Sequence, residues 1–190
     1  MQTMDPRWNQ FLQNPWKCSS CDEEHIGIFD LGFAKPEQWQ GSETPLPNSA
    51  LADSTNILTE DFCILDGEHY FVRCILELPL QGLSGERFAF GVWSTLSKAN
   101  FEIYCESFDS GEQGRLGPWF GWFSNRISGY PDTLNMKCQV HPQAKRMPPS
   151  IELQPIHHRL VSESQDGISF DRLAEIYSLL GHTMPKTKSQ

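Results

Sequence analysis

The sequence lacks the features that mark several large classes of protein. No run of apolar residues approaches the ~20 that a membrane-spanning helix requires, and residues 1–6 have neither the basic nor the apolar region of a secretory signal. No basic patch with interleaved aromatic residues is present, which disfavours a nucleic-acid partner. We therefore expect a soluble, cytoplasmic protein with no membrane partner and no nucleic-acid partner.

The sequence motifs of common enzyme classes are missing as well. There is no Walker loop, no G-x-G-x-x-G fingerprint and no serine in a G-x-S-x-G turn. Internal repeats and low-complexity segments are also missing. The sequence therefore predicts no particular reaction or substrate, and it leaves the question of enzymatic activity open, with the balance against it.

The composition is that of a folded domain. The 190 residues suffice for one domain with a sizeable core, and 38% of them are hydrophobic and 12% aromatic. The formal net charge is 15 − 24 = −9, which we interpret as a source of solubility. Six cysteines in a chain of this length without an export signal are expected to be reduced, buried or metal-bound.

Residues 18–25, CSSCDEEH, are the one stretch whose residue types and spacing indicate a definite chemistry. Cys18 and Cys21 lie three residues apart, so a tight turn can direct both sulfur atoms to one point, and His25 can reach the same point four residues later. These are three of the four ligands of a tetrahedral Zn²⁺ site. We call this stretch the knuckle and predict that it binds zinc.

The fourth zinc ligand has to come from elsewhere, because the chain has no second C-x-x-C pair. Cys63 is the first choice, since it is expected near the start of a strand beside an acidic residue. His141, at the end of another predicted strand, is the second choice, and His69 is the third.

Two other interpretations of the knuckle stay open. Cys18 and Cys21 are plain thiols in a surface turn in the first, and a redox-active C-x-x-C pair in the second. The redox interpretation is weakened because no strand precedes the pair in a βαβ unit, as such motifs require.

Hydrophobic periodicity and turn residues predict an α+β fold. A short helix is expected between Asp5-Pro6 and Asn14-Pro15, then an extended segment over 26–60 with one helical turn near 37–39. The further elements expected are a hairpin over 61–79, strands over 88–96, 118–123, 133–141 and 151–153, a helix after Ser97, and a last helix from Ser169 to Gly181. The sheet should be mostly antiparallel, with a C-terminal helix and the N-terminal knuckle.

The hairpin fixes the expected orientation of Cys63. Asp66-Gly67 is a strong two-residue turn, which would pair Leu65 with Glu68 and Cys63 with Tyr70. We expect one structural domain overall, with an N-terminal arm over 1–59, a core over 60–182 and a frayed tail over 183–190.

Several stretches together resemble one protein family. They are Cys18-x-x-Cys21-x-x-x-His25, Asp61-x-Cys63-Ile64-Leu65-Asp66, Phe71-x-Arg73-x-x-Leu76-Glu77-Leu78-Pro79 and Phe90-Gly91-Val92-Trp93-Ser94-Thr95-Leu96-Ser97. The family is the bacterial domain of unknown function 2199, and the resemblance covers about residues 16–182. It implies a small bacterial cytoplasmic protein and no established activity. The family usually has glycine after the second cysteine, where this chain has Asp22, which tolerates a left-handed backbone better than most residues.

Two further features are candidates for an interaction surface. Trp119, Phe120, Trp122 and Phe123 form an aromatic run that either packs into the core or lines a groove. Arg73 is expected on a sheet face, either in an ion pair with Asp61 or Asp66 or as an anion-binding group.

These observations favour a zinc-stabilised module that binds a protein or peptide partner through an aromatic sheet edge. The first alternative is a metal-dependent hydrolase that uses the same cysteines and histidines with one open coordination position. The second is a C-x-x-C redox protein. The sequence indicates no particular oligomeric state.

Overall fold

The computed structural model describes residues 4–52 and 54–184 and shows an α+β fold. The helices are α1 (Arg7–Gln13), α2 (Lys98–Phe108), α3 (Arg159–Asp166) and α4 (Phe170–Leu179), with short 3₁₀ helices η1 (Asn48–Leu51) and η2 (Gln113–Arg115). The strands are β1 (Pro15–Lys17), β2 (Glu24–Ile26), β3 (Leu31–Gly32), β4 (Ile57–Leu58), β5 (Phe62–Leu65), β6 (His69–Pro79), β7 (Arg87–Leu96), β8 (Trp119–Trp122), β9 (Lys137–His141) and β10 (Ser150–Leu153).

The main sheet has eight strands and is mostly antiparallel. Its principal order is β3-β7-β6-β10-β9-β8, and β5 adds to β6 and carries β4. The pairs β3–β7 and β10–β6 are parallel, and the others are antiparallel. An isolated bridge between Ser94 and Phe123 joins the end of β8 to β7. The sheet therefore curls back on itself around the core.

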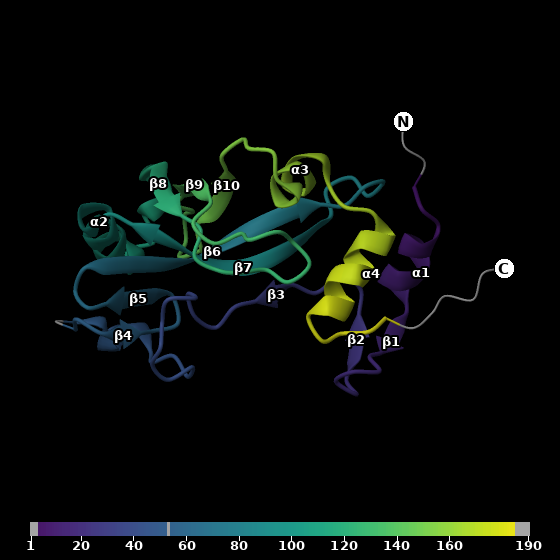
Figure 1. Cartoon of the computed structure of the whole chain (residues 1–190), viewed down its shortest axis with the longest axis horizontal. Helices are drawn as coiled ribbons and strands as arrows, with labels where there is room; N and C mark the ends of the chain where they lie inside the picture. The colour runs from purple at the N-terminus through teal and green to yellow at the C-terminus, as the bar shows by residue number, and fades with distance from the viewer. Residues whose placement is uncertain (1–3, 53, 185–190) are drawn as a thin grey trace.

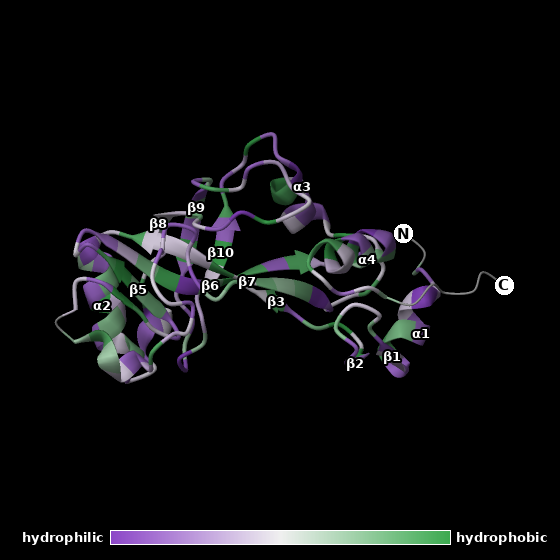
Figure 2. Cartoon of the chain, turned by 60° about the horizontal axis from the view of Figure 1, so that its bottom comes forward, coloured by the Kyte–Doolittle hydropathy of each residue, from purple (hydrophilic) through white to green (hydrophobic). Residues whose placement is uncertain are grey.

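The long pair β6–β7 connects two ends of the molecule (Figure 1). One end carries α2, β4 and β5, and the other carries α1, α4 and the small β1–β2 sheet. Phe101 of α2 contacts Phe62 and Tyr70, while Tyr177 of α4 contacts Phe88. Hydrophobic residues lie along the central strands, while the outer surfaces of the helices carry many hydrophilic residues (Figure 2). A single large cluster of buried side chains thus extends from one end to the other.

The helices α2 and α4 begin where the sequence predicts. Ser169 accepts a hydrogen bond from the Arg172 N–H at the start of α4, and Ser97 accepts one from the Asn100 N–H at the start of α2. Trp8 of α1 is fully buried and packs edge to face on Phe170 of α4, with a ring-centroid distance of 4.9 Å. This contact attaches the N-terminal helix to the C-terminal one.

The predicted register of the hairpin is wrong by one residue. Asp66 and Gly67 have the expected positive φ angles of 57° and 67°, and the Glu68 N–H donates to the Leu65 carbonyl. Glu68 is nevertheless an extra residue, because Leu65 pairs with His69 and Cys63 pairs with Phe71. A shift of one residue moves a side chain to the other face of a sheet, so Cys63 lies opposite to the predicted side.

Other segments differ from the prediction as well. The segment 26–60 contributes β3 and β4 to the main sheet instead of remaining only extended, and α3 was not foreseen. The strand expected over 133–141 begins only at Lys137, because Asn135 has a φ of 61°. Thr183 and Met184 are packed rather than frayed, while residues 185–190 of the predicted tail lie outside the described residues.

Candidate metal centre

The knuckle is a tight turn between the antiparallel strands β1 and β2. Trp16 pairs with His25 across these strands, and the Cys18 N–H donates to the Glu23 carbonyl at 2.9 Å. Asp22 has a φ of 59°, so it adopts the left-handed conformation that the turn requires. The sequence therefore folds locally into the loop that the cysteine spacing predicts.

Three backbone N–H groups surround the sulfur atom of Cys18. Those of Ser20, Cys21 and Thr183 donate to the sulfur at 3.4, 3.5 and 3.3 Å. Burial opposes the charged thiolate, but the hydrogen bonds from these N–H groups outweigh it and lower the pKa of Cys18 to about 6. Cys18 is thus prepared to act as a thiolate ligand.

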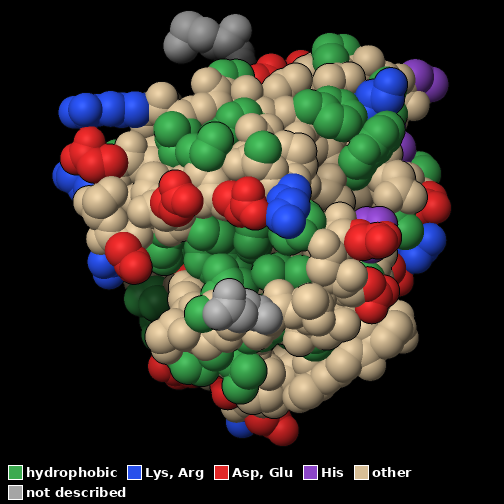
Figure 3. All heavy atoms as spheres, turned by 90° about the vertical axis from the view of Figure 1, so that its left-hand side faces the viewer, with side chains coloured by type: hydrophobic (Ala, Val, Ile, Leu, Met, Phe, Trp, Pro, Cys, Tyr) green, Lys and Arg blue, Asp and Glu red, His purple; other side chains and the backbone are tan. Residues whose placement is uncertain are grey.

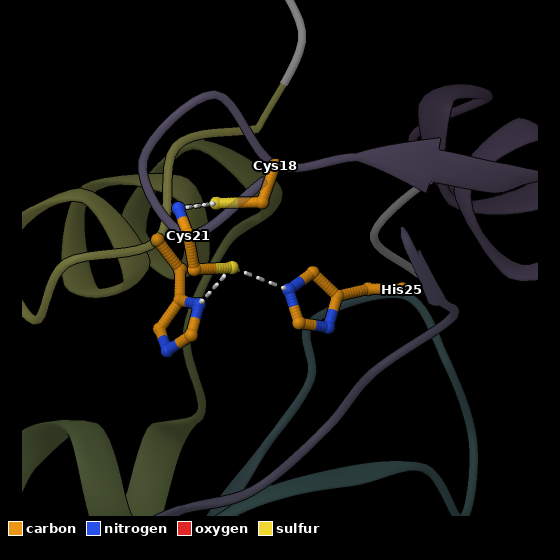
Figure 4. Close-up of side chains that lie close together, drawn as sticks. Cys18, Cys21 and His25 are labelled. Atoms are coloured by element: carbon orange, nitrogen blue, oxygen red, sulfur yellow. Dashed lines mark hydrogen bonds between the residues drawn. The ribbon is translucent and has the colours of Figure 1, made fainter. Parts of the chain in front are cut away.

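The sulfur atom of Cys21 lies between two imidazole rings (Figure 4). It is 3.3 Å from Nε2 of His25 and 3.6 Å from Nδ1 of His182. Cys21 is exposed, whereas both histidines are half-buried. His182 follows α4, so a residue near the end of the described chain completes a group that begins at residue 18.

The four donor atoms lie close enough together to hold a metal ion. The two sulfur and two nitrogen atoms of Cys18, Cys21, His25 and His182 all lie within 4.8 Å of one another. Zn–S bonds of about 2.3 Å and Zn–N bonds of about 2.0–2.1 Å place neighbouring ligands ~3.3–3.8 Å apart in a tetrahedron. The two distances around Cys21 are already in this range, so only small shifts would complete the geometry.

A stack of aromatic rings positions both histidines. His25 is stacked on Phe29 at 4.4 Å, and Phe29 is stacked in turn on Tyr177 of α4 at 4.4 Å. The Tyr177 hydroxyl donates to the Phe29 carbonyl at 2.8 Å and accepts from the Phe29 N–H at 3.0 Å. The ring of His182 meets that of Phe29 edge to face at 5.0 Å. The donor group is therefore held by the packing of α4 on the segment after β2.

Comparison with protein families gives one match. A family described as an uncharacterized protein conserved in bacteria, DUF2199, matches residues 17–168 of the 190. The chain belongs to this family. Comparison with curated proteins and with solved structures gave no match. The DUF2199 match includes the knuckle and ends before α4 and His182.

The structure of this DUF2199 member does not bring the predicted fourth ligands to the knuckle. Cys63 is fully buried in β5 against Leu58, Phe71 and Trp93, at the opposite end of the molecule (Figure 1). His141 lies in β9, with its Nε2 atom 3.3 Å from a Glu152 carboxylate oxygen. His69 is exposed at the start of β6. The choice of Cys63 rested on its place near the start of a strand beside an acidic residue, and that strand, β5, lies far from the knuckle.

His182 was missed because its sequence context carries no ligand signal. It is separated from Cys21 by 161 residues and has no cysteine or histidine at a ligand spacing nearby. The one available indication was its position directly after Gly181, at the end of a helix whose apolar residues have to pack on another segment. His157 and His158, by contrast, are not part of the donor group, and Nδ1 of His158 accepts from the Leu160 N–H at the start of α3.

The predicted aromatic surface is only partly exposed. Phe120 and Trp122 are 44% and 40% exposed and pack edge to face with a centroid distance of 5.1 Å. Phe123 is fully buried, and Trp119 packs partly against the core near Tyr104. Strand alternation explains this division, because Phe120 and Trp122 share one face of β8.

A pocket of about 520 Å³ adjoins Trp122. It is lined by Gln38, Leu65, His69, Phe71, Thr95, Trp122 and Asn135. Figure 3 shows the end of the molecule with α2, β4 and β5, where hydrophobic side chains reach the surface between charged ones. Lys137 lies 5.9 Å from the ring of Trp122, a cation–π contact.

Among residues 4–52 and 54–184, no helix combines the length and the hydrophobicity of a membrane span.

Proposed function

We propose that Cys18, Cys21, His25 and His182 hold a structural zinc ion, and that the protein is a zinc-stabilised module that binds a peptide or protein partner. The observation that carries the metal proposal is the convergence of four zinc-type donors from two distant segments. We call this group the zinc clasp, because it joins the knuckle to the segment after α4.

The number of donors favours a structural role over catalysis. A tetrahedral zinc ion with four protein ligands has no position left for water or substrate, whereas catalytic zinc sites keep one open. The hydrolase alternative would require one of the four donors to stay away from the metal. A redox role has less support, because the pair lies in a turn between two strands and not at a helix N-terminus.

The binding proposal rests on Phe120 and Trp122. An exposed tryptophan beside a pocket is a common anchor for a partner side chain, because it buries a large area with little loss of conformational freedom. The pocket next to Trp122 offers the apolar side chains of Leu65 and Phe71 together with the polar side chains of Gln38 and Asn135. This combination suits an extended peptide that inserts one apolar side chain and presents backbone groups to the polar ones.

Metal analysis tests the zinc clasp. Protein purified without added zinc should contain one zinc ion per chain, and His182→Ala should lose most of it or bind it far more weakly. His141→Ala and Cys63→Ala are the matched controls and should keep the full zinc content. Equal zinc in all four proteins would show that His182 is not a ligand, and no zinc in the unmutated protein would contradict the proposal.

The coordination number separates the structural role from the hydrolase alternative. Co²⁺ substituted for zinc should give the intense visible absorption of a four-coordinate site with two thiolates. His182→Ala should change this spectrum, because water would replace a nitrogen ligand. A spectrum of higher coordination in the unmutated protein would favour the catalytic alternative.

Peptide selection tests the aromatic surface. A peptide selected from a random displayed library against the zinc-loaded protein should bind Trp122→Ala at least about tenfold more weakly, a loss of about 1.4 kcal/mol. Ile103 of α2 is 44% exposed and offers a matched control, so Ile103→Ala should bind normally. Selected peptides whose binding is indifferent to Trp122→Ala and to Phe120→Ala would contradict this surface.

A further inference from the structure

Arg73 of β6 lies over a pair of glycines on the outer face of the sheet. Gly32 of β3 and Gly91 of β7 are paired in parallel register. A Cβ atom added to Gly32 would lie 3.4 Å from Nη2 of Arg73, and one added to Gly91 would lie 3.8 Å from the same atom. Neither glycine has a positive φ, so the backbone conformation does not require glycine at either position. The glycines instead leave a trough in which the guanidinium lies.

The trough forms part of a pocket of about 300 Å³, which we call the Arg73 pocket. Its lining includes Asp30, Gly32, Asp61, Arg73, Gly91 and Pro148. This volume is at the lower limit for small-molecule sites. The Arg73 pocket and the pocket beside Trp122 share no lining residue.

The guanidinium of Arg73 has few partners within the described residues. Its one hydrogen bond runs from Nη1 to the Glu60 carbonyl and is long, at 3.5 Å. Arg73 forms no ion pair with Asp61 or Asp66 in the part of the chain that the structure describes, so the predicted ion pair is not found. Arginine presents five N–H donors in a planar fork that matches a carboxylate. Most of these donors are available to a ligand in the pocket.

Two carboxylates limit which anion can enter. Asp30 accepts from the Ala89 N–H at 2.8 Å through one oxygen, and Asp61 accepts from the Asn48 side chain at 2.7 Å through one oxygen. The second oxygen of each has no hydrogen bond among residues 4–52 and 54–184. These two negative charges repel a multiply charged anion such as phosphate, and they attract a cationic group placed beside the arginine.

We propose that the Arg73 pocket binds a small zwitterion of the amino-acid type, with one carboxylate and one ammonium group. Arg73 takes the carboxylate through two parallel N–H···O bonds. Asp30, which precedes Gly32 by two residues, takes the ammonium group through its free oxygen, and Asp61 adds a second negative charge to the pocket lining. The glycine pair provides room for the ligand to lie flat on the sheet. This site does not depend on the zinc clasp or on Trp122.

An NMR titration of the full-length, zinc-loaded protein tests the proposal. Glycine, β-alanine and γ-aminobutyrate carry the same two charges at increasing spacing. At least one of them should shift the amide resonances of Gly32, Arg73 and Gly91 in a saturable manner. Acetate and methylammonium, which each carry one of the charges, should bind at least about tenfold more weakly. Inorganic phosphate should also bind more weakly than the best zwitterion.

Variants then locate the binding groups. Arg73→Gln should abolish saturable binding, and Asp30→Asn, which keeps an acceptor for the Ala89 N–H, should weaken it about tenfold. Gly32→Ala retains all the charges and should also weaken binding, because its methyl group occupies the trough; it keeps the test valid if Arg73→Gln fails to fold. Arg87 lies on the same face of the sheet and pairs with Glu77, so Arg87→Gln should bind normally.

Several results would overturn the proposal. One is the absence of shifts at these residues with all three amino acids at millimolar concentration. Another is acetate or phosphate binding as tightly as the best zwitterion, which would indicate an anion site. A third is unchanged binding in a folded Arg73→Gln protein, which would place the ligand elsewhere.

Discussion

Cys18 of the zinc clasp and the cysteines of the sheet core are equally buried, but their sulfur atoms have different hydrogen-bond partners. Cys18 accepts three N–H donors, and its pKa is lowered to about 6. Cys63 and Cys138 lie in the sheet core, where burial raises the pKa of their thiols to about 12 and about 11. The position of backbone donors, and not residue type, thus decides which thiols are ready to bind a metal.

Thiol reactivity should show the largest effect of this difference. In chelated, folded protein at neutral pH, we expect iodoacetamide to label Cys21 at a rate at least ~100-fold above those of Cys63 and Cys138, because Cys21 is exposed while the core sulfur atoms are buried and burial raises their pKa. Cys18 is as buried as the core cysteines, and it should still react faster than they do because its lowered pKa makes it a thiolate. Intact-mass spectrometry with peptide mapping measures this. Zinc should protect the clasp pair, and denaturant should expose all six cysteines. Rapid labelling of Cys63 in the folded protein would contradict the expected difference in reactivity between the clasp and core cysteines.

Zinc removal should have the next largest effect. Zinc at ~1,000 times its Kd stabilises the folded state by about 4 kcal/mol, if unfolded chains bind it negligibly. Chelation should therefore lower the free energy of unfolding by about this amount, as measured by urea unfolding. Cys18→Ser should be less stable and should not respond to the chelator. The free energy of unfolding of Cys63→Ala should still fall by the full amount on chelation. If chelation has no effect on Cys63→Ala, the proposed set of four ligands is wrong.

Tyr177 contacts both Phe29, which lies under His25 of the zinc clasp, and Phe88 of the main sheet. Substitution by phenylalanine removes its hydroxyl and keeps its ring. Tyr177→Phe leaves the ring stack under His25 in place but removes both hydrogen bonds to the Phe29 backbone. Because these backbone groups would lose their partner, we expect a loss of about 1–3 kcal/mol in urea unfolding. Zinc content should stay at one ion per chain. Loss of zinc from this variant would mean that the hydroxyl, rather than the ring, positions His25.

The smallest effect is expected from the ion pair between α1 and α4. The guanidinium of Arg7 donates hydrogen bonds to Asp171 and Asp5 and holds the pKa of both carboxyls below their ordinary value. A depressed folded-state pKa stabilises the protein above the unfolded pKa, and this stabilisation is lost as pH falls through the folded pKa. Asp171→Asn should thus cost about 0.5 kcal/mol at pH 7, since the side chain of Asp171 is 77% exposed.

Measured by urea unfolding, the difference between Asp171→Asn and the unmutated protein should shrink as the pH falls below about 4, the usual pKa of an aspartate, and should vanish below the lowered folded-state pKa of Asp171. The same difference at pH 7 and at pH 3 would show that the effect is not electrostatic.

Local chemistry was predictable from the sequence, and long-range placement was not. The knuckle turn follows from Cys18 and Cys21, and the left-handed backbone at Asp22 and Asp66 follows from tolerant residues next to or within tight turns. Periodicity located α2, α4 and most of the sheet. The sequence does not distinguish a two-residue hairpin loop from a three-residue loop that includes Glu68, because the hairpin keeps an apolar face with either length. The choice of the two-residue loop alone placed Cys63 on the wrong face of the sheet.

His182 illustrates the other limit of sequence analysis. Its role depends on how α4 packs against Phe29 and the knuckle, which is a tertiary contact and leaves no spacing pattern. Likewise, the glycines under Arg73 are recognisable as a pair only when β3 is known to lie beside β7, since 59 positions separate Gly32 from Gly91 (91 − 32).

The separation of 161 residues between Cys21 and His182 has a consequence for how the protein is made. A ribosome releases the knuckle early, with three donors and no fourth, and it releases His182 only after the whole sheet has been synthesised. Until α4 docks, a zinc ion at the knuckle would have an open position that water, or another chain's thiol, can fill. If the group binds zinc as proposed, the clasp would form last, and tight zinc retention would report that the sheet between its two halves has finished folding.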